Sequence, residues 1–183
     1  VPFGIAVTDI LCGAQLVQGI LAALIRRQKT GAGALIEVSL MESLLDFQFE
    51  LLTTYFTNKE QPQRSNVANG QPLLSAPYGI YATANGYIAL AMMDIHLLAK
   101  AIGCTGLNRF SKDQVFSERD AIKTILANYL RTQKTDIWLE QLQNEGLWAM
   151  EVLDWEDMTK SEAYKCLQME QSVKTASGDI ITT

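Results

Sequence analysis

The residue best placed to do chemistry is a single aspartate, Asp9, near the start of a long apolar helical pattern. Apolar side chains recur at helical spacing from Leu11 to Ile25, directly after it. The unpaired N–H groups and the dipole at a helix N-terminus favour a negatively charged side chain. A carboxylate there can cap the helix or attack an activated carbonyl as a nucleophile. Taken alone, Asp9 favours the cap.

The cysteines and the histidine do not form a metal-binding pattern. Cys12, Cys104 and Cys166 are far apart and odd in number, and His96 is the only histidine. This spacing argues against a zinc site or a disulfide framework and suits a reducing cytoplasm. Cys12 is expected to be a small core residue, and His96 a structural or surface residue. We therefore predict no metal site and a cytoplasmic location.

Charge and hydropathy exclude two classes of partner. The net charge of −5 leaves no basic stripe for a nucleic acid backbone. The longest apolar run, 10–25, is interrupted by glycine and glutamine and stops at Arg26, short of the roughly 20 apolar residues of a membrane span. Arg26, Arg27 and Lys29 are read as charges at a helix C-terminus rather than as phosphate ligands.

The first third of the chain predicts two helices around a strand. The pattern indicates a mostly buried helix over 8–29, closed by Gly31 or Gly33, a strand over 34–40 and a helix over 42–57. Residues 58–75 hold two prolines and few apolar side chains, which is typical of a loop or linker.

From residue 77 onward the pattern predicts a small α+β domain. Two β runs, 78–83 and 87–92, flank an Asn-Gly turn and indicate a hairpin. The remaining predicted elements are helices over 94–102, 117–132 (capped by Ser117), 135–144 (capped by Thr135), 154 onward and 161–167, with β structure over 147–153 and 172–181. Trp138, Trp148 and Trp155 are expected to be packing residues. The fold class is therefore α+β.

Several ordered motifs resemble one known family. They are Gly4–Gly13 with Asp9 inside it, the ILAAL helix at 20–24, Thr30-Gly31-Ala32-Gly33, the strand end and acidic residue at 36–43, and the hairpin motifs at 77–81 and 85–91. In this order they resemble the class III CoA-transferases (formyl-CoA transferase and carnitine CoA-transferase, the CaiB/BaiF type). The resemblance covers the whole chain, is tightest over 4–43 and 77–92, and is loose after Cys104.

The resemblance implies a fold, a reaction and a nucleophile. Residues 1–58 would belong to a Rossmann-like large domain, 59–76 to a linker, 77–160 to a small α+β domain, and 161–183 would return toward the large domain. Asp9 would attack an acyl-CoA thioester, with the CoA thioester as substrate and no permanently bound cofactor. The partners implied are an acyl-CoA, a small carboxylic acid and a second copy of the chain in an interlocked homodimer.

The resemblance also implies that the chain is an internal fragment. Family members bind CoA largely through a half that precedes the aspartate, so the cofactor-binding residues are unknown here. We expect the isolated chain neither to turn over nor to bind CoA well. Some members cover the reacting aspartate with a glycine-rich loop, and the stretch from Asn66 to Gly70 occupies that place.

Two other functions stay open. One is a 2-methylacyl-CoA racemase of the same fold, in which Asp9 would act as an acid or base on the α-carbon. The other is a non-catalytic interaction domain that kept the fold but lost the activity. The identity of the acids exchanged is not readable from the sequence.

Overall fold

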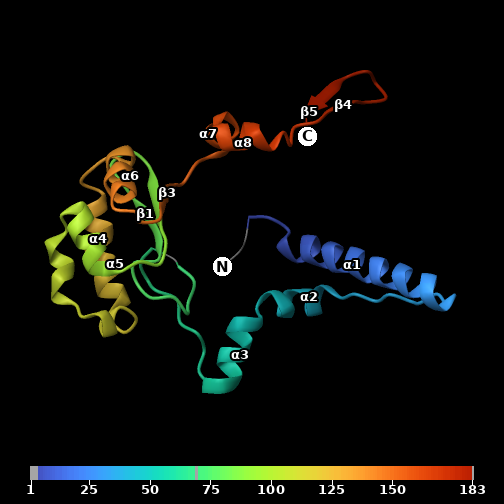
Figure 1. Ribbon diagram of the computed structural model, residues 1–183, viewed down its shortest axis with the longest axis horizontal. Helices are drawn as coiled ribbons and strands as arrows, with labels where there is room; N and C mark the ends of the chain where they lie inside the picture. Colours follow the sequence, from blue (N-terminus) through green and yellow to red (C-terminus); the bar gives the residue numbers. More distant parts are fainter. Residues whose placement is uncertain (1–3, 69, 183) are drawn as a thin grey trace. The chain divides into compact units, whose positions relative to one another are not determined.

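The computed structural model describes residues 4–68 and 70–182 (Figure 1). The chain divides after Gln63 into two units, 1–63 and 64–183. The first unit is helical, and the second combines helices with small antiparallel sheets. This composition confirms the predicted α+β class. The assignment of the chain to a large and a small domain stays a prediction.

The first unit contains three helices, α1 (Val7–Thr30), α2 (Leu40–Phe47) and α3 (Phe49–Asn58). The predicted first helix is confirmed, and Gly31 closes it in the left-handed conformation with φ +72° while its N–H donates to the Arg27 carbonyl. The helix predicted over 42–57 is present but breaks at Gln48, which separates α2 from α3.

Two expectations for this unit are wrong. Residues 32–39 are extended but form no strand, since within the described part of the first unit no other strand pairs with them. The predicted burial of the first helix is also absent, because none of the residues of α1 is buried. Only one side of α1 meets α2 and the extended segment, so the rest of its apolar surface lies open within this unit.

The length and composition of α1 bear on the expected absence of a membrane span. With 24 residues and an apolar composition, α1 is long and apolar enough to cross a membrane. The core helix of a soluble protein passes the same test, so length and composition do not distinguish the two. The absence of a membrane partner stays a prediction.

The second unit is built on a three-stranded antiparallel sheet of β1 (Gly79–Ala82), β2 (Tyr87–Leu90) and β3 (Ala149–Glu151) in that order. The predicted hairpin is confirmed, with Tyr81 opposite Ile88. Side chains alternate, so that Tyr81, Ile88 and Leu90 are buried on one face. Ile80 and Met150, which flank Ala89 on the other face, are exposed.

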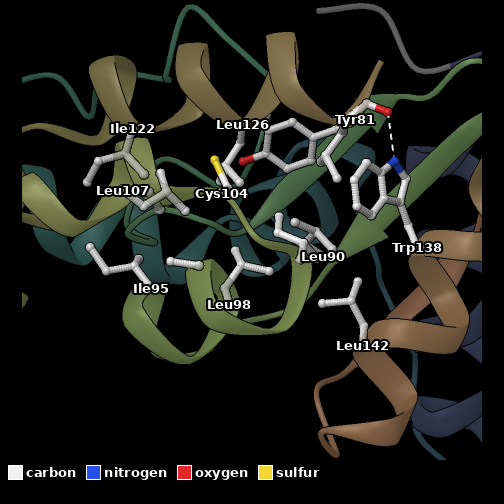
Figure 2. Close-up of a cluster of buried hydrophobic side chains, with 14 of the residues drawn as sticks. Tyr81, Leu90, Ile95, Leu98, Cys104, Leu107, Ile122, Leu126, Trp138 and Leu142 are labelled. Atoms are coloured by element: carbon white, nitrogen blue, oxygen red, sulfur yellow. Dashed lines mark hydrogen bonds between the residues drawn. The ribbon is translucent and has the colours of Figure 1, made fainter. Parts of the chain in front are cut away.

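Three helices cover the buried face of this sheet. They are α4 (Ile95–Ile102), α5 (Arg119–Leu130) and α6 (Thr135–Asn144), with two 3-10 turns, η1 (Thr105–Arg109) and η2 (Lys112–Gln114), between α4 and α5. Figure 2 shows side chains from the sheet and these helices meeting in one core. Trp138 is only 4% exposed, and its indole N–H donates to the Leu130 carbonyl at 2.8 Å.

The three tryptophans do not share one role. Trp138 is a packing residue as predicted, but Trp148 and Trp155 are 80% and 81% exposed. Trp148 precedes β3 beside the open face of the sheet, and Trp155 begins α7 (Trp155–Lys160). No other part of the described second unit covers either ring.

Asp94 caps α4 by accepting the N–H groups of His96 and Leu97. The two predicted caps Ser117 and Thr135 do not hold those positions. Ser117 is not a cap, because α5 begins at Arg119 and the Ser117 hydroxyl donates to the Gln114 carbonyl instead. Thr135 is the first residue of α6 rather than its cap, and its N–H donates to the Asn85 side chain in the hairpin turn.

The last part of the chain follows the prediction closely. α7 is capped by Asp154, and α8 (Glu162–Leu167) is capped by Ser161. The strands β4 (Ser172–Lys174) and β5 (Ile180–Thr182) pair as an antiparallel hairpin.

Candidate active site

Asp9 is the third residue of α1 and carries its carboxylate on the first turn. The N-cap is Ala6, and no side chain caps the helix. Asp9 is exposed and makes no hydrogen bond to another described residue through its carboxylate. The capping role that the residue type favours is therefore not what the structure shows. The carboxylate is free to meet a ligand beside the N–H groups of the first turn.

The surroundings of Asp9 leave room for a bulky group. A Cβ placed on Gly4 or Gly13 would meet no heavy atom within 4 Å. Cys12, one turn after Asp9, is half-buried. An acyl thioester could thus reach the carboxylate from the side of the two glycines without displacing another part of the first unit.

A polar contact sets the position of α1 against α2. Ser43 is only 1% exposed, and its hydroxyl lies 2.6 Å from the Gln15 side-chain oxygen and 2.9 Å from the Ser39 carbonyl. The Gln15 amide donates in turn to Asp46 at 3.0 Å. These bonds link α1 to α2 at Gln15, six residues after Asp9. Sequence reasoning missed them, although a glutamine and a serine on otherwise apolar helical faces were a signal.

A second contact holds the other half of α1. The extended segment packs so closely on the helix that a Cβ on Gly19 would lie 2.9 Å from Ile36. Beside this contact is a hollow of about 190 Å³, lined by apolar side chains of α1, by the segment at 33–36 and by Arg27. Arg27 follows Asp9 by 18 residues, which is roughly 27 Å along a helix. The two residues therefore do not form one site within this unit.

The other sequence candidates described below belong to the second unit. His96 is half-buried on α4, and Cys104 is buried in the core, where desolvation raises the pKa of its thiol. Cys166 is exposed, and all three cysteines are free. Over residues 4–68 and 70–182, no three His, Cys, Asp or Glu side chains gather as a metal site would require.

The stretch predicted as a lid belongs to the second unit. Ser65 and Asn66 are bonded to Asp120 on α5, and the Ala68 carbonyl accepts the N–H of Ile80 on β1. Asn69, also part of the predicted lid, lies outside the described residues. The described part of this stretch is thus anchored at two points.

The second unit also has an apolar hollow of about 530 Å³. It lies beside β2 and β3 and is lined by Tyr78, Ala89, Leu147, Trp148 and Met150, among others. Gln143 is the main polar side chain in this lining. Among the described residues of the lining, Tyr78 is the only titratable side chain.

Comparison with known proteins places this geometry in a family. The sequence model of CoA-transferase family III matches residues 1–183. The chain is 26% identical over 158 residues to an acetyl-CoA:oxalate CoA-transferase of Acetobacter aceti, covering 82% of this chain and 40% of that protein. It is also 26% identical over 152 residues to a human succinyl-CoA:glutarate CoA-transferase, covering 79% and 34% respectively.

Solved structures show the same fold. A CaiB/BaiF family protein from Brucella suis superposes with a TM-score of 0.73 at 22% identity, over 99% of this chain and 52% of that one. Rv3272 from Mycobacterium tuberculosis gives 0.71 at 20% identity, over 99% and 48%. The chain thus spans about a third to a half of the length of the proteins it matches. Because the family model matches the chain from residue 1 to residue 183, the chain belongs to CoA-transferase family III.

Proposed function

We propose that the protein transfers coenzyme A between an acyl-CoA thioester and a carboxylic acid, with Asp9 as the covalent nucleophile. The observation that carries the proposal is the exposed carboxylate of Asp9 on the first turn of α1, which does not cap the helix. Asp9 lies within the stretch that most resembles the family. The relatives named above are CoA-transferases that act with oxalate or glutarate. This supports the reaction type but leaves the acids unassigned.

The proposed chemistry conserves the thioester bond energy. An Asp9 carboxylate oxygen attacks the thioester carbonyl, the C–S bond breaks, and CoA leaves as its thiolate. The thiolate then attacks the Asp9 carbonyl of the mixed anhydride, which forms an aspartyl-CoA thioester and releases the donor acid.

The acceptor acid reverses these two steps. Its carboxylate attacks the aspartyl-CoA carbonyl and releases the thiolate, and the thiolate attacks the acceptor carbonyl. This regenerates the Asp9 carboxylate and gives the new acyl-CoA. Water is never the acceptor, so the protein must hold the intermediates away from solvent.

Isotope transfer in the full-length protein tests this route. In a single turnover with an acceptor acid labelled in both carboxylate oxygens with ¹⁸O, the bridging oxygen of the anhydride remains on Asp9. Mass spectrometry of the Asp9 peptide should show the gain of one ¹⁸O, and hydroxylamine should trap an acyl-Asp9 intermediate. Asp9→Asn should abolish both. Asp136→Asn, which changes another exposed first-turn aspartate, should abolish neither.

Other outcomes point to the alternatives. Exchange of the α-hydrogen of a 2-methylacyl-CoA with solvent deuterium, without label on Asp9, would indicate a racemase. CoA transfer that survives Asp9→Ala would refute the nucleophile. The isolated chain of 183 residues is expected to be inactive, and measurable transfer by it would contradict that expectation.

A further inference from the structure

Asp120, on the first turn of α5, joins a distant stretch of chain to this helix. One carboxylate oxygen accepts the Ser65 hydroxyl at 2.6 Å. The other accepts the Asn66 side-chain amide at 3.0 Å and lies 3.4 Å from the Asn66 backbone nitrogen. Ser65 is 5% exposed, so its bond to Asp120 is shielded from water, whereas Asn66 is exposed. Hydrogen bonds to an ionised carboxylate are stronger than those between neutral groups.

The same stretch is held at its other end by the sheet. The Ile80 N–H donates to the Ala68 carbonyl at 3.3 Å, along the free edge of β1. Gly79 permits this contact, because a Cβ there would lie 2.5 Å from the Ala68 oxygen. Ala68 itself has φ +56°, a left-handed conformation that costs energy in a residue other than glycine. Ala68 adopts this left-handed conformation between two attachments, the bonds of Ser65 and Asn66 to Asp120 and the bond of its own carbonyl to Ile80.

The interior of the stretch is closed by a short local bond. The Val67 N–H donates to the Ser65 oxygen at 3.2 Å. The Ser65 hydroxyl also lies 2.7 Å from the Val67 carbonyl, so its one hydrogen is shared between that oxygen and Asp120. Movement of Ser65 away from α5 would break its bond to Asp120, and the hydroxyl would then donate to the Val67 carbonyl alone.

We propose that Asp120 is a latch that fixes residues 65–68 as a rigid wall of the second unit, although the resemblance predicts a lid over 66–70, which overlaps this stretch. Asp120 is a positioning residue in this proposal, and its two carboxylate oxygens restrain one end while β1 restrains the other. The inference is local to the second unit and does not depend on the proposed function.

Amide hydrogen exchange in the full chain, read by NMR, tests the latch. The Asn66 and Val67 amides report on the Asp120 end, and the Ile80 amide reports on the β1 end. In Asp120→Ala we expect the Asn66 and Val67 amides to exchange at least roughly tenfold faster, as the loss of charge-assisted bonds implies. The Leu126 amide in the core should change much less.

A matched control separates the latch from the general value of an aspartate at a helix start. Asp136 occupies the first turn of α6 and is exposed, so Asp136→Ala removes the favourable charge at a helix N-terminus without touching residues 65–68. This variant should leave the Asn66 and Val67 amides unchanged. Acceleration equal to that in Asp120→Ala, or uniform acceleration that includes Leu126, would overturn the proposal.

Two milder variants keep the test decisive if Asp120→Ala does not fold. Asp120→Asn retains one acceptor oxygen and should give intermediate exchange. Ser65→Ala keeps the Asp120 charge but removes the hydroxyl, so Val67 should exchange faster than Asn66. Wild-type exchange at both amides in these variants would refute the latch.

Discussion

Asn85 shows how one turn residue holds the start of a helix that lies 50 residues further along the chain. Its side-chain oxygen accepts the Thr135 backbone N–H at 2.9 Å and the Thr135 hydroxyl at 3.2 Å. The Thr135 hydroxyl also lies 2.7 Å from that of Thr83. Asn85 thereby supplies a cap to α6 from the hairpin turn. The Asn-Gly pattern predicted only the hairpin turn, and the tertiary role of Asn85 was not visible in the sequence.

We predict that Asn85→Asp stabilises the protein. A carboxylate keeps both acceptor contacts and adds a negative charge at the N-terminus of α6, which contributes about 0.3–1 kcal/mol. Urea unfolding should show a higher midpoint with an unchanged slope. Asn85→Ala should cost about 1 kcal/mol, because it leaves the Thr135 N–H without its acceptor. A destabilised Asn85→Asp variant would show that the amide donors matter instead.

Trp138 supports a second residue-scale prediction. Trp138→Phe retains most of the apolar ring but leaves the buried Leu130 carbonyl without its indole partner. The expected loss is about 1–3 kcal/mol of unfolding free energy. Trp148→Phe, at an 80% exposed position, should change stability by less than about 0.5 kcal/mol. Equal effects in the two variants would contradict the assigned role of the bond.

At the scale of elements, Asp94 couples helix α4 to pH. Lys112 is its ion-pair partner at 2.6 Å, and the His96 and Leu97 N–H groups also donate to it. The Lys112 side chain, followed by these N–H groups, lowers the pKa of Asp94 to about 2. The pKa of Asp94 in the folded protein is below the ordinary value. Ionised Asp94 therefore adds to the free energy of unfolding above that ordinary value, and this stabilisation is lost as pH falls toward 2.

We therefore expect acid to destabilise the protein through this cap. Between pH 5 and 2, the urea midpoint of the wild type should fall more steeply than that of Asp94→Asn. At pH 7 the variant should be less stable by about 0.3–1 kcal/mol, because asparagine still caps the helix but loses the negative charge that interacts with Lys112 and with the helix N-terminus. Parallel pH profiles for the two proteins would show that the cap does not titrate in this range.

The elements that sequence reasoning located are those whose causes are local. The hairpin follows from its Asn-Gly turn, and α1 is bounded by its apolar period and by Gly31. The strand expected over 34–40 failed because a strand needs a partner, which local pattern does not supply. The Gln15–Ser43 bond was missed for the same reason, since it joins residues 28 positions apart. Asp9 itself was found through the surrounding motif rather than through its own environment.

At the scale of the whole molecule, the buried apolar core belongs to the second unit alone. Every residue of the core cluster lies between Ala76 and Leu142. In the described part of the first unit the one buried residue is Ser43, a polar side chain. The two units therefore differ in what stabilises them, because burial of apolar surface is the main favourable term in folding.

This difference predicts the behaviour of the separated units. Residues 64–183 should fold alone, and the part that holds the core, residues 76–142, should show one cooperative thermal transition with near-ultraviolet circular dichroism. Residues 1–63 should show partial helicity that melts gradually, because no apolar core supports their helices. Cooperative unfolding of 1–63 alone, or a molten 64–183, would contradict this division.

The uneven exposure of the three tryptophans gives the protein a built-in set of optical reporters. With its ring enclosed, Trp138 should emit at shorter wavelength and resist acrylamide, whereas Trp148 and Trp155 should emit near the water-exposed limit and be quenched readily. Unfolding of the second unit would then be followed through Trp138. A blue shift confined to the quenchable fraction would reveal that another surface had come to rest against β3 or α7.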